Sequence, residues 1–349
     1  MEDKMVDGGK DLKTPKRTQI AEIGISELLR RLFEGTGFTN RQILAGDSSN
    51  QTASINRLMM EGVDFDLVYT PLKHLGYKSA LNAIGPLYAK CYNPKSLSYT
   101  LALSARFAAE DIVELWTGVV AAAKEHKIEN LALELKASMT GLAIGITAQG
   151  EQDPDTINSA PKPAGTDLIC ITGNIGAAYM GLHVLEREKV AFNKIAAADM
   201  SSYKQPDLSR YKYILSLYLS PEINPKIVEQ FKEASLIPAA GYFITDGLAS
   251  TVKELCLEHG VGAKIYLDKI PIASQTMEMA KVINMDTVTA ALNGGDDYKF
   301  LFVIPLSEHE KFHKEFPNVD IIGHLCKAEA GALLVTPEGA EIPIRAQGF

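Results

Sequence analysis

Apolar and polar residues follow two different periods along the chain. Between residues 108 and 127, apolar side chains recur three or four positions apart, which is the spacing of one face of a helix and predicts a helix there. Short apolar runs predict strands instead, and they lie at residues 98–103, 142–148, 167–172 and 300–304. Strands and helices are therefore expected in both halves of the chain.

A change in composition separates these two halves. Residues 151–165 are rich in Pro, Asp, Asn, Ser and Gly, which marks a linker or a long loop. The 349 residues are enough for two domains that each bury a core. We therefore predict a disordered tail at 1–18, an N-terminal domain at 19–150, a linker at 151–165 and a C-terminal domain at 166–349.

The overall charge is that of an ordinary soluble protein. The chain has 43 acidic and 35 basic side chains and a formal net charge of −8, which disfavours a nucleic-acid-binding function. No apolar run approaches the roughly 18 residues of a membrane span, and the N-terminal segment is charged rather than apolar. The sequence therefore predicts a cytoplasmic protein with no membrane partner and no nucleic-acid partner.

The cysteines are widely spaced along the chain. None of them forms the C-x-x-C pattern that is expected of a zinc or redox site. We therefore expect reduced thiols in the core at Cys91, Cys170, Cys256 and Cys326.

A glycine-rich turn follows the predicted strand at 167–172. Residues 173–176 join this strand to a predicted helix, and the free N–H groups of such a turn could hold an anion. A plain strand-to-helix connection is the alternative, because the turn does not match G-x-G-x-x-G. One side of the helix is expected to carry Tyr179, Leu182, His183 and Leu185.

Two later segments combine glycine with carboxylates. Thr245-Asp246-Gly247 precedes a predicted helix at 248–259 that stops at Gly260, and a helix cap is the simplest role for Asp246. The segment 294–298 reads Gly-Gly-Asp-Asp-Tyr and precedes the strand at 300–304. Its glycines allow the backbone to approach a ligand closely while its carboxylates present charge. A tight surface turn is the alternative interpretation.

Six segments, in family order and spacing, resemble thiamine-monophosphate kinase, which belongs to the superfamily of aminoimidazole-ribonucleotide synthetase. They are residues 20–24, 46–47, 60–65, 167–173, 244–248 and 294–298. The resemblance implies a two-domain, PurM-like α/β fold with mixed sheets, in which the N-terminal domain closes a β-barrel with its copy in a homodimer. It also implies binding of ATP and Mg²⁺ and transfer of a phosphoryl group to thiamine phosphate.

The same resemblance assigns roles to individual residues. Asp246 corresponds to a catalytic and metal-binding aspartate, and Asp47 corresponds to a further metal ligand. The nearly complete second-domain motif implies substrate binding by Gly294, Gly295, Asp296, Asp297 and Tyr298.

Other expected metal positions carry a different residue type. Arg57 stands at the first acid of the family's D-x-L-x-E-G segment, Pro86 and Phe243 stand at two further acids, and the GGDTT motif falls on residues 134–138. A unit charge about 4 Å from a divalent ion is worth roughly 8 kcal/mol at an effective dielectric of about 20. Exchanging an acid for a cation therefore acts strongly against the metal.

These departures lead to three hypotheses. The chain is a catalytically impaired paralogue that keeps the fold and a ligand cleft, an active thiamine-monophosphate kinase with a rearranged metal site, or another ATP-using member of the superfamily. We prefer the first hypothesis, because the substitutions fall on the metal positions while the folding landmarks remain. A direct contact with nucleotide phosphate, or a solvated surface position, is expected for Arg57, Lys136 and Ser138.

Overall fold

The computed structural model describes residues 20–36, 43–45, 51–153, 160–196 and 207–346. The chain divides into two compact units, one made of residues 1–41 with 348–349 and the other of residues 42–347. Helix α1 (Ile20–Phe33) belongs to the first unit, and its Glu27 accepts hydrogen bonds from Arg30 and Arg31, each at 2.7 Å. The tail expected at 1–18 lies outside the described residues.

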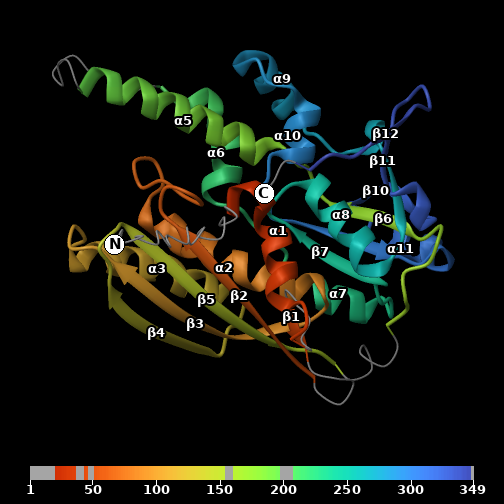
Figure 1. Cartoon of the computed structure of the whole chain (residues 1–349), viewed down its shortest axis with the longest axis horizontal. Helices are drawn as coiled ribbons and strands as arrows, with labels where there is room; N and C mark the ends of the chain where they lie inside the picture. The colour runs from red at the N-terminus through yellow and green to blue at the C-terminus, as the bar shows by residue number, and fades with distance from the viewer. Residues whose placement is uncertain (1–19, 37–42, 46–50, 154–159, 197–206, 347–349) are drawn as a thin grey trace, which may run out of the picture. The chain divides into compact units, whose positions relative to one another are not determined.

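The second unit begins with a five-stranded sheet in the order β1-β2-β5-β3-β4 (Figure 1). Strands β3 and β4 run parallel, and the other neighbouring strands run antiparallel. The strands are β1 (Ile43–Ala45), β2 (Thr52–Met60), β3 (Asn93–Leu103), β4 (Asn130–Ala137) and β5 (Leu142–Glu151). The strands expected at 98–103 and 142–148 are thereby confirmed within β3 and β5.

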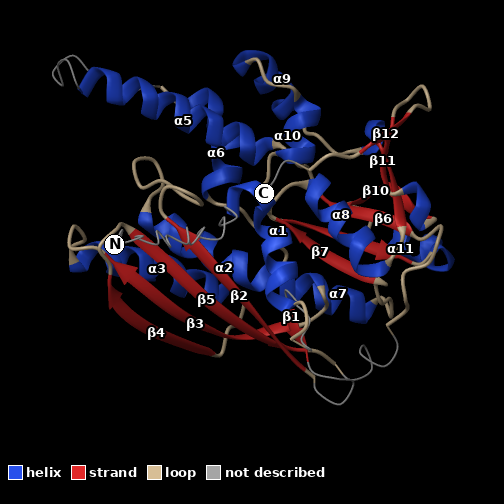
Figure 2. Ribbon diagram, in the orientation of Figure 1, coloured by secondary structure: helices blue, strands red, loops and turns tan. Residues whose placement is uncertain are grey.

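Two helices cover one face of this sheet, namely α2 (Leu72–Ala89) and α3 (Ala109–Glu125) (Figure 2). Side chains alternate across a strand, so Ala53, Ile55 and Met59 of β2 are buried beneath the helices, and Arg57 on the same face is partly buried. The helix expected at 108–127 is confirmed as α3. The opposite face of the sheet carries exposed residues such as Leu58 and Thr100.

A second, seven-stranded sheet has the order β12-β11-β8-β10-β6-β9-β7, and β11 runs parallel to β8 while the other neighbours are antiparallel. Its strands are β6 (Leu168–Thr172), β7 (Ala240–Ile244), β8 (Gly262–Tyr266), β9 (Lys299–Ile304), β10 (Val319–Cys326), β11 (Ala332–Val335) and β12 (Glu341–Pro343). Both sheets are therefore mixed, as expected. The strands expected at 167–172 and 300–304 are β6 and β9.

Helices lie on both faces of the second sheet. Along β9, Leu301 and Val303 pack with α8 (Leu248–His259), whereas Phe300 and Phe302 point to the other face, where α7 (Ile227–Glu233) and α11 (His309–Glu315) pack. A third apolar cluster joins α5 (Ala177–Ala196), α6 (Lys212–Leu219), α9 (Ser274–Ile283) and α10 (Thr287–Asn293).

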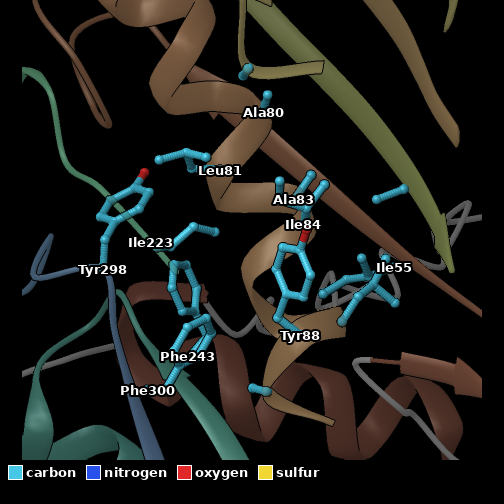
Figure 3. Close-up of a cluster of buried hydrophobic side chains, with 14 of the residues drawn as sticks. Ile55, Ala80, Leu81, Ala83, Ile84, Tyr88, Ile223, Phe243, Tyr298 and Phe300 are labelled. Atoms are coloured by element: carbon cyan, nitrogen blue, oxygen red, sulfur yellow. The ribbon is translucent and has the colours of Figure 1, made fainter. Parts of the chain in front are cut away.

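One apolar core connects the two sheets through α2. Figure 3 shows Phe243 and Phe300 of the second sheet, with Tyr298 from the turn before β9, on one side of α2 and Ile55 of the first sheet on the other. The segment between β5 and β6 carries the expected linker at 151–165, of which residues 154–159 are outside the described part. The domain limits themselves stay a prediction.

Several local expectations have a clear outcome. Gly260 ends α8 in the left-handed conformation, as predicted. All four cysteines are free, but only Cys91 and Cys170 are buried, so the expectation of core thiols was wrong for the half-buried Cys256 and Cys326. On the expected side of α5, Leu185 is buried and Tyr179 and Leu182 are partly buried against the same cluster, whereas His183 is exposed. Among the described helices, none is long and apolar enough to span a membrane.

Candidate functional site

Two motifs that are about fifty residues apart in the sequence meet at the end of β7. The Asp296 N–H donates to the Thr245 carbonyl oxygen at 2.7 Å, and the Tyr298 N–H donates to the Ile244 oxygen at 3.0 Å. Gly295 has a φ of +76°, and a Cβ atom there would lie 2.6 Å from the Thr245 oxygen. Glycine at this position therefore permits the contact that holds the two motifs together.

Asp246 does not cap α8, so its side chain is available for another role. The N-cap residue of α8 is Gly247, so the helix-cap interpretation of Asp246 was wrong. The Asp246 side chain is exposed, and its Oδ2 accepts a hydrogen bond from Thr245 Oγ1 at 3.1 Å. Its carboxylate therefore faces a space that a ligand can reach.

That space is a cavity of about 640 Å³, within the size range of small-molecule sites. It is bounded by the end of β2 and the loop after it, by α2, α5 and α6, and by the two joined motifs. Its lining residues are Arg57, Leu58, Met59, Gly62, Val63, Asp64, Phe65, Asp66, Tyr69, Asn82, Leu182, Glu186, Lys189, Tyr218, Thr245, Asp246, Gly294 and Asp296. The cavity thus combines carboxylates, cations and aromatic rings from both halves of the chain.

Three of the lining carboxylates influence one another. Partial burial raises the pKa of Asp64, and the nearby charges of Asp296 and Asp246 raise it further, while Lys78 and a hydrogen bond from the Met60 N–H oppose the rise. That hydrogen bond reaches Asp64 Oδ2 at 2.7 Å. The three acids therefore form one electrostatic group.

Lys78 of α2 supplies one counter-charge to this group. Its side chain is only 5% exposed, its Nζ lies 3.2 Å from Asp296 Oδ2, and it stands 4.0 Å from the centre of the Tyr218 ring. An ion pair and a cation–π contact together stabilise a buried ammonium group. Asp296 is thereby neutralised from within the protein.

Arg57 supplies a second positive charge to the cavity that Asp246 also lines. It occupies a position of β2 between the buried Ile55 and Met59, on the face that is covered by helices. Burial lowers the pKa of the Arg57 guanidinium, while Asp246 and Glu254 act in the opposite direction. An arginine nevertheless stays charged at neutral pH. Its Nε is buried and has no hydrogen-bond partner among the described residues.

The resemblance implies Mg²⁺ at this site, but the described residues do not fit that ion. In the part of the chain that the structure covers, no group of three or more His, Cys, Asp or Glu side chains is arranged to hold a metal. The expected acid positions Pro86 and Phe243 lie in apolar surroundings, and a Cβ at Gly85 would lie 2.3 Å from Phe243 Cε1. Asp47 lies outside the described residues.

The far wall of the cavity contains two polar pairs that the sequence did not indicate. Lys189 Nζ donates to Asp66 Oδ2 at 2.5 Å, and the Tyr69 hydroxyl donates to Glu186 Oε1 at 2.5 Å. Both pairs connect the loop after β2 to α5. The charged run around Glu186 carries no motif that would distinguish it from an ordinary solvated helix face.

Two residues of the expected substrate motif point into the interior instead. Asp297 is buried and its Oδ1 accepts the Gly176 N–H at 2.7 Å, so the glycine turn before α5 binds a carboxyl group of the protein itself. Burial raises the pKa of Asp297 to about 8. Tyr298 is 1% exposed and lies against Phe243 with the ring centres 5.3 Å apart.

The structure thus separates the expected site residues into two groups. The cavity brings together Arg57, Asp246, Gly294 and Asp296. Lys136 lies on the exposed edge strand β4, and Ser138 follows that strand and donates to the Thr140 oxygen at 2.8 Å. Both lie outside the set of described residues that line the cavity, and their phosphate role stays a prediction.

Comparison with known proteins adds sequence relatives to this picture. Residues 222–333 match the family model described as AIR synthase related protein, C-terminal domain. The thiamine-monophosphate kinase of Bacillus subtilis (strain 168) is 24% identical over 300 residues, which cover 83% of this chain and 85% of the relative. That of Aquifex aeolicus (strain VF5) is 21% identical over 295 residues, with 84% and 89% covered.

Solved structures share the fold. The thiamine monophosphate kinase of Aquifex aeolicus superposes with a TM-score of 0.77 at 19% identity, covering 93% of this chain and 100% of that chain. AaThiL complexed with AMPPCP and TMP gives 0.75 at 19% identity, with 93% and 97% covered. The hydrogenase maturation protein HypE in complex with ATP gives 0.60 at 16% identity, with 94% and 95% covered. The chain is therefore similar to the AIR synthase related C-terminal domain over residues 222–333, to thiamine-monophosphate kinases in sequence, and to their solved structures in fold.

Proposed function

We propose that this protein binds ATP and thiamine phosphate at the cavity but transfers the phosphoryl group slowly or not at all, as a catalytically impaired relative of thiamine-monophosphate kinase. The observation that carries this proposal is that Arg57, at a position where the family has an acid, lines the same cavity as Asp246 and interacts with its charge. Retained ligand binding is supported by the cavity, its size and the likeness to a structure that contains AMPPCP and TMP.

The physical reason for impairment lies in charge. Phosphoryl transfer depends on cations that bridge and neutralise the phosphate oxygens while the two reactants are held in line. A protein cation whose charge interacts with those of Asp246 and Glu254 offsets the acids instead, and a partly buried arginine on a strand has little freedom to follow a transferring group. The cavity is therefore better suited to holding a ligand than to turning it over.

A homodimer in the cytoplasm is part of the same proposal. The uncovered face of the first sheet carries small or polar side chains at its centre, including Ser98, Thr100 and Thr147, and it exposes the apolar Leu58 and Met60. A flat face of this kind can pack against a second sheet about 10 Å away. Pairing with the same face of a second copy would cover it.

The decisive experiment measures binding and turnover separately. We expect calorimetry to detect ATP and thiamine phosphate binding to the purified full chain, while an assay for thiamine diphosphate with Mg-ATP detects no product. Turnover of about 1 per second or faster, the ordinary range of enzymes, would establish instead the alternative of an active kinase with a rearranged metal site.

A third candidate is another ATP-using reaction of the superfamily. It is favoured by the fold likeness to HypE in complex with ATP. Binding of ATP without any binding of thiamine phosphate would support this candidate against the proposed function. A thiamine-monophosphate kinase of the Bacillus subtilis type, assayed in parallel, provides the positive control for both measurements.

A further inference from the structure

We propose that Arg57 is a resident cation of the cavity, whose guanidinium neutralises Asp246 and thereby prevents a divalent metal ion from binding to the surrounding carboxylates. The inference rests on the proposed function only for the location of the ligand site. It concerns the site without nucleotide, so it can be tested whether or not ATP binds.

The backbone fixes where the Arg57 side chain can go. β2 pairs along its length with β5, and Arg57 stands opposite Ile146 in that pairing. Its neighbours on the same face, Ile55 and Met59, are 1% and 3% exposed. A one-residue slip that would turn Arg57 outward would expose these apolar side chains. The guanidinium is therefore directed toward the helix-covered side of the sheet, and Arg57 lines the same cavity as Asp246, whose charge acts on it.

The cavity acids are already matched by protein cations. Asp296 has the ammonium of Lys78 at 3.2 Å, and Asp246 has the guanidinium of Arg57 as its electrostatic partner. Asp64 is influenced by both acids and by Lys78. A divalent ion that entered this group would meet two fixed positive charges before it gained its ligands.

The charged groups of Arg57 and Lys78 differ in the contacts that they make with the protein. The Lys78 charge is held by its ion pair and by the Tyr218 ring. The buried Nε of Arg57, in contrast, has no hydrogen-bond partner within the described residues. Part of the guanidinium charge is therefore not met by a direct bond, and its positive potential extends to an approaching cation.

The test is Mn²⁺ binding to the full chain without nucleotide, measured by calorimetry and by the loss of the free Mn²⁺ electron spin resonance signal. We expect no saturable site for the wild type below about 1 mM, the weak end of carboxylate sites. Arg57→Asp exchanges the resident cation for a ligand and should create one saturable site that is tighter by about a hundredfold or more.

Three further variants make the outcome specific. Arg57→Lys keeps the charge and should bind Mn²⁺ no better than the wild type. Arg57→Ala removes the charge without adding a ligand and should give an intermediate affinity. The double variant Arg57→Asp with Asp246→Asn should lose the site that Arg57→Asp creates, because Asp246 supplies one of its ligands.

Two results would overturn the proposal. One is a saturable Mn²⁺ site in the wild-type protein that disappears in Asp246→Asn. The other is a folded Arg57→Asp variant that gains no site. If Arg57→Asp does not fold, the comparison of Arg57→Ala with Arg57→Lys decides, since equal affinities would refute the role of charge. Failure of the wild type to bind ATP would count against the proposed function alone.

Discussion

The ammonium of Lys78 lies 3.2 Å from Asp296 Oδ2, which connects α2 of the first half to the turn before β9 in the second half. The lysine is buried, whereas the aspartate is partly open to the cavity. The pair therefore places a carboxylate at the ligand site and fixes the two halves of the chain relative to each other within the unit 42–347.

Lys78→Met should destabilise the protein by about 1–3 kcal/mol, because it leaves Asp296 without its buried partner. Urea unfolding of the purified variant measures this difference. Lys136→Met on the exposed strand β4 is the matched control and should change stability by no more than about 0.5 kcal/mol. Adding Asp296→Asn to Lys78→Met should recover part of the loss. A double variant that is no more stable than Lys78→Met alone would show that the ion pair contributes little.

Asp297→Asn should flatten the dependence of stability on pH. Burial, with a smaller contribution from the Asp296 charge, raises the pKa of Asp297 from 3.8 to about 8 against the opposing effects of the Gly176 hydrogen bond and Lys299. Between these pH values the folded protein holds a proton that the unfolded chain releases. Stability is therefore fullest at the acidic end and falls as the pH rises toward 8. The asparagine stays neutral and keeps the acceptor for the Gly176 N–H.

The measurement is the free energy of unfolding at several points between pH 5 and pH 8. The fall across this range should be smaller in Asp297→Asn than in the wild type. Asp320→Asn, at an exposed position of β10, should leave the wild-type profile unchanged. Identical profiles for Asp297→Asn and the wild type would contradict the protonated carboxyl.

The sequence predicted the elements well because their signals are local. The helical period at 108–127 and the apolar runs at 142–148 and 300–304 are found as α3, β5 and β9. The site was predicted less completely, because it depends on which face each residue occupies. Asp296 and Asp297 are adjacent in sequence, yet a left-handed turn directs one to the cavity and the other to Gly176.

Arg57 is a second residue whose orientation the sequence alone did not determine. The motif comparison indicated a cation at an acid position, but the sequence favoured a solvated surface charge there over a direct contact with phosphate. Only the pairing of β2 with β5, which buries Ile55 and Met59, determines that the arginine points inward. Lys136 has no such constraint, because its edge strand is exposed along its length.

Gly295→Ala should destabilise the protein more than the replacement of a left-handed glycine by alanine normally does. At Gly295 the new Cβ would lie 2.6 Å from the Thr245 oxygen, so overpacking of about 1–3 kcal/mol adds to the backbone strain of about 1 kcal/mol. Gly339→Ala is the matched control, because its φ is +86° and its Cβ would meet open space among the described residues. Thermal unfolding of both variants gives the comparison, and equal losses would exclude a steric role for Gly295.

Thr100→Arg should convert the proposed dimer into a monomer. Thr100 is exposed on the uncovered face of β3, and the proposed dimer would bury a charged side chain from each copy in a dry sheet-to-sheet contact. Light scattering after size exclusion should change from twice 37.9 kDa to 37.9 kDa. Val113→Arg, which is also exposed but lies on α3, should leave the dimer intact. A dimer that survives Thr100→Arg would place the interface elsewhere, because the strand face has no room for two buried guanidinium groups without partners.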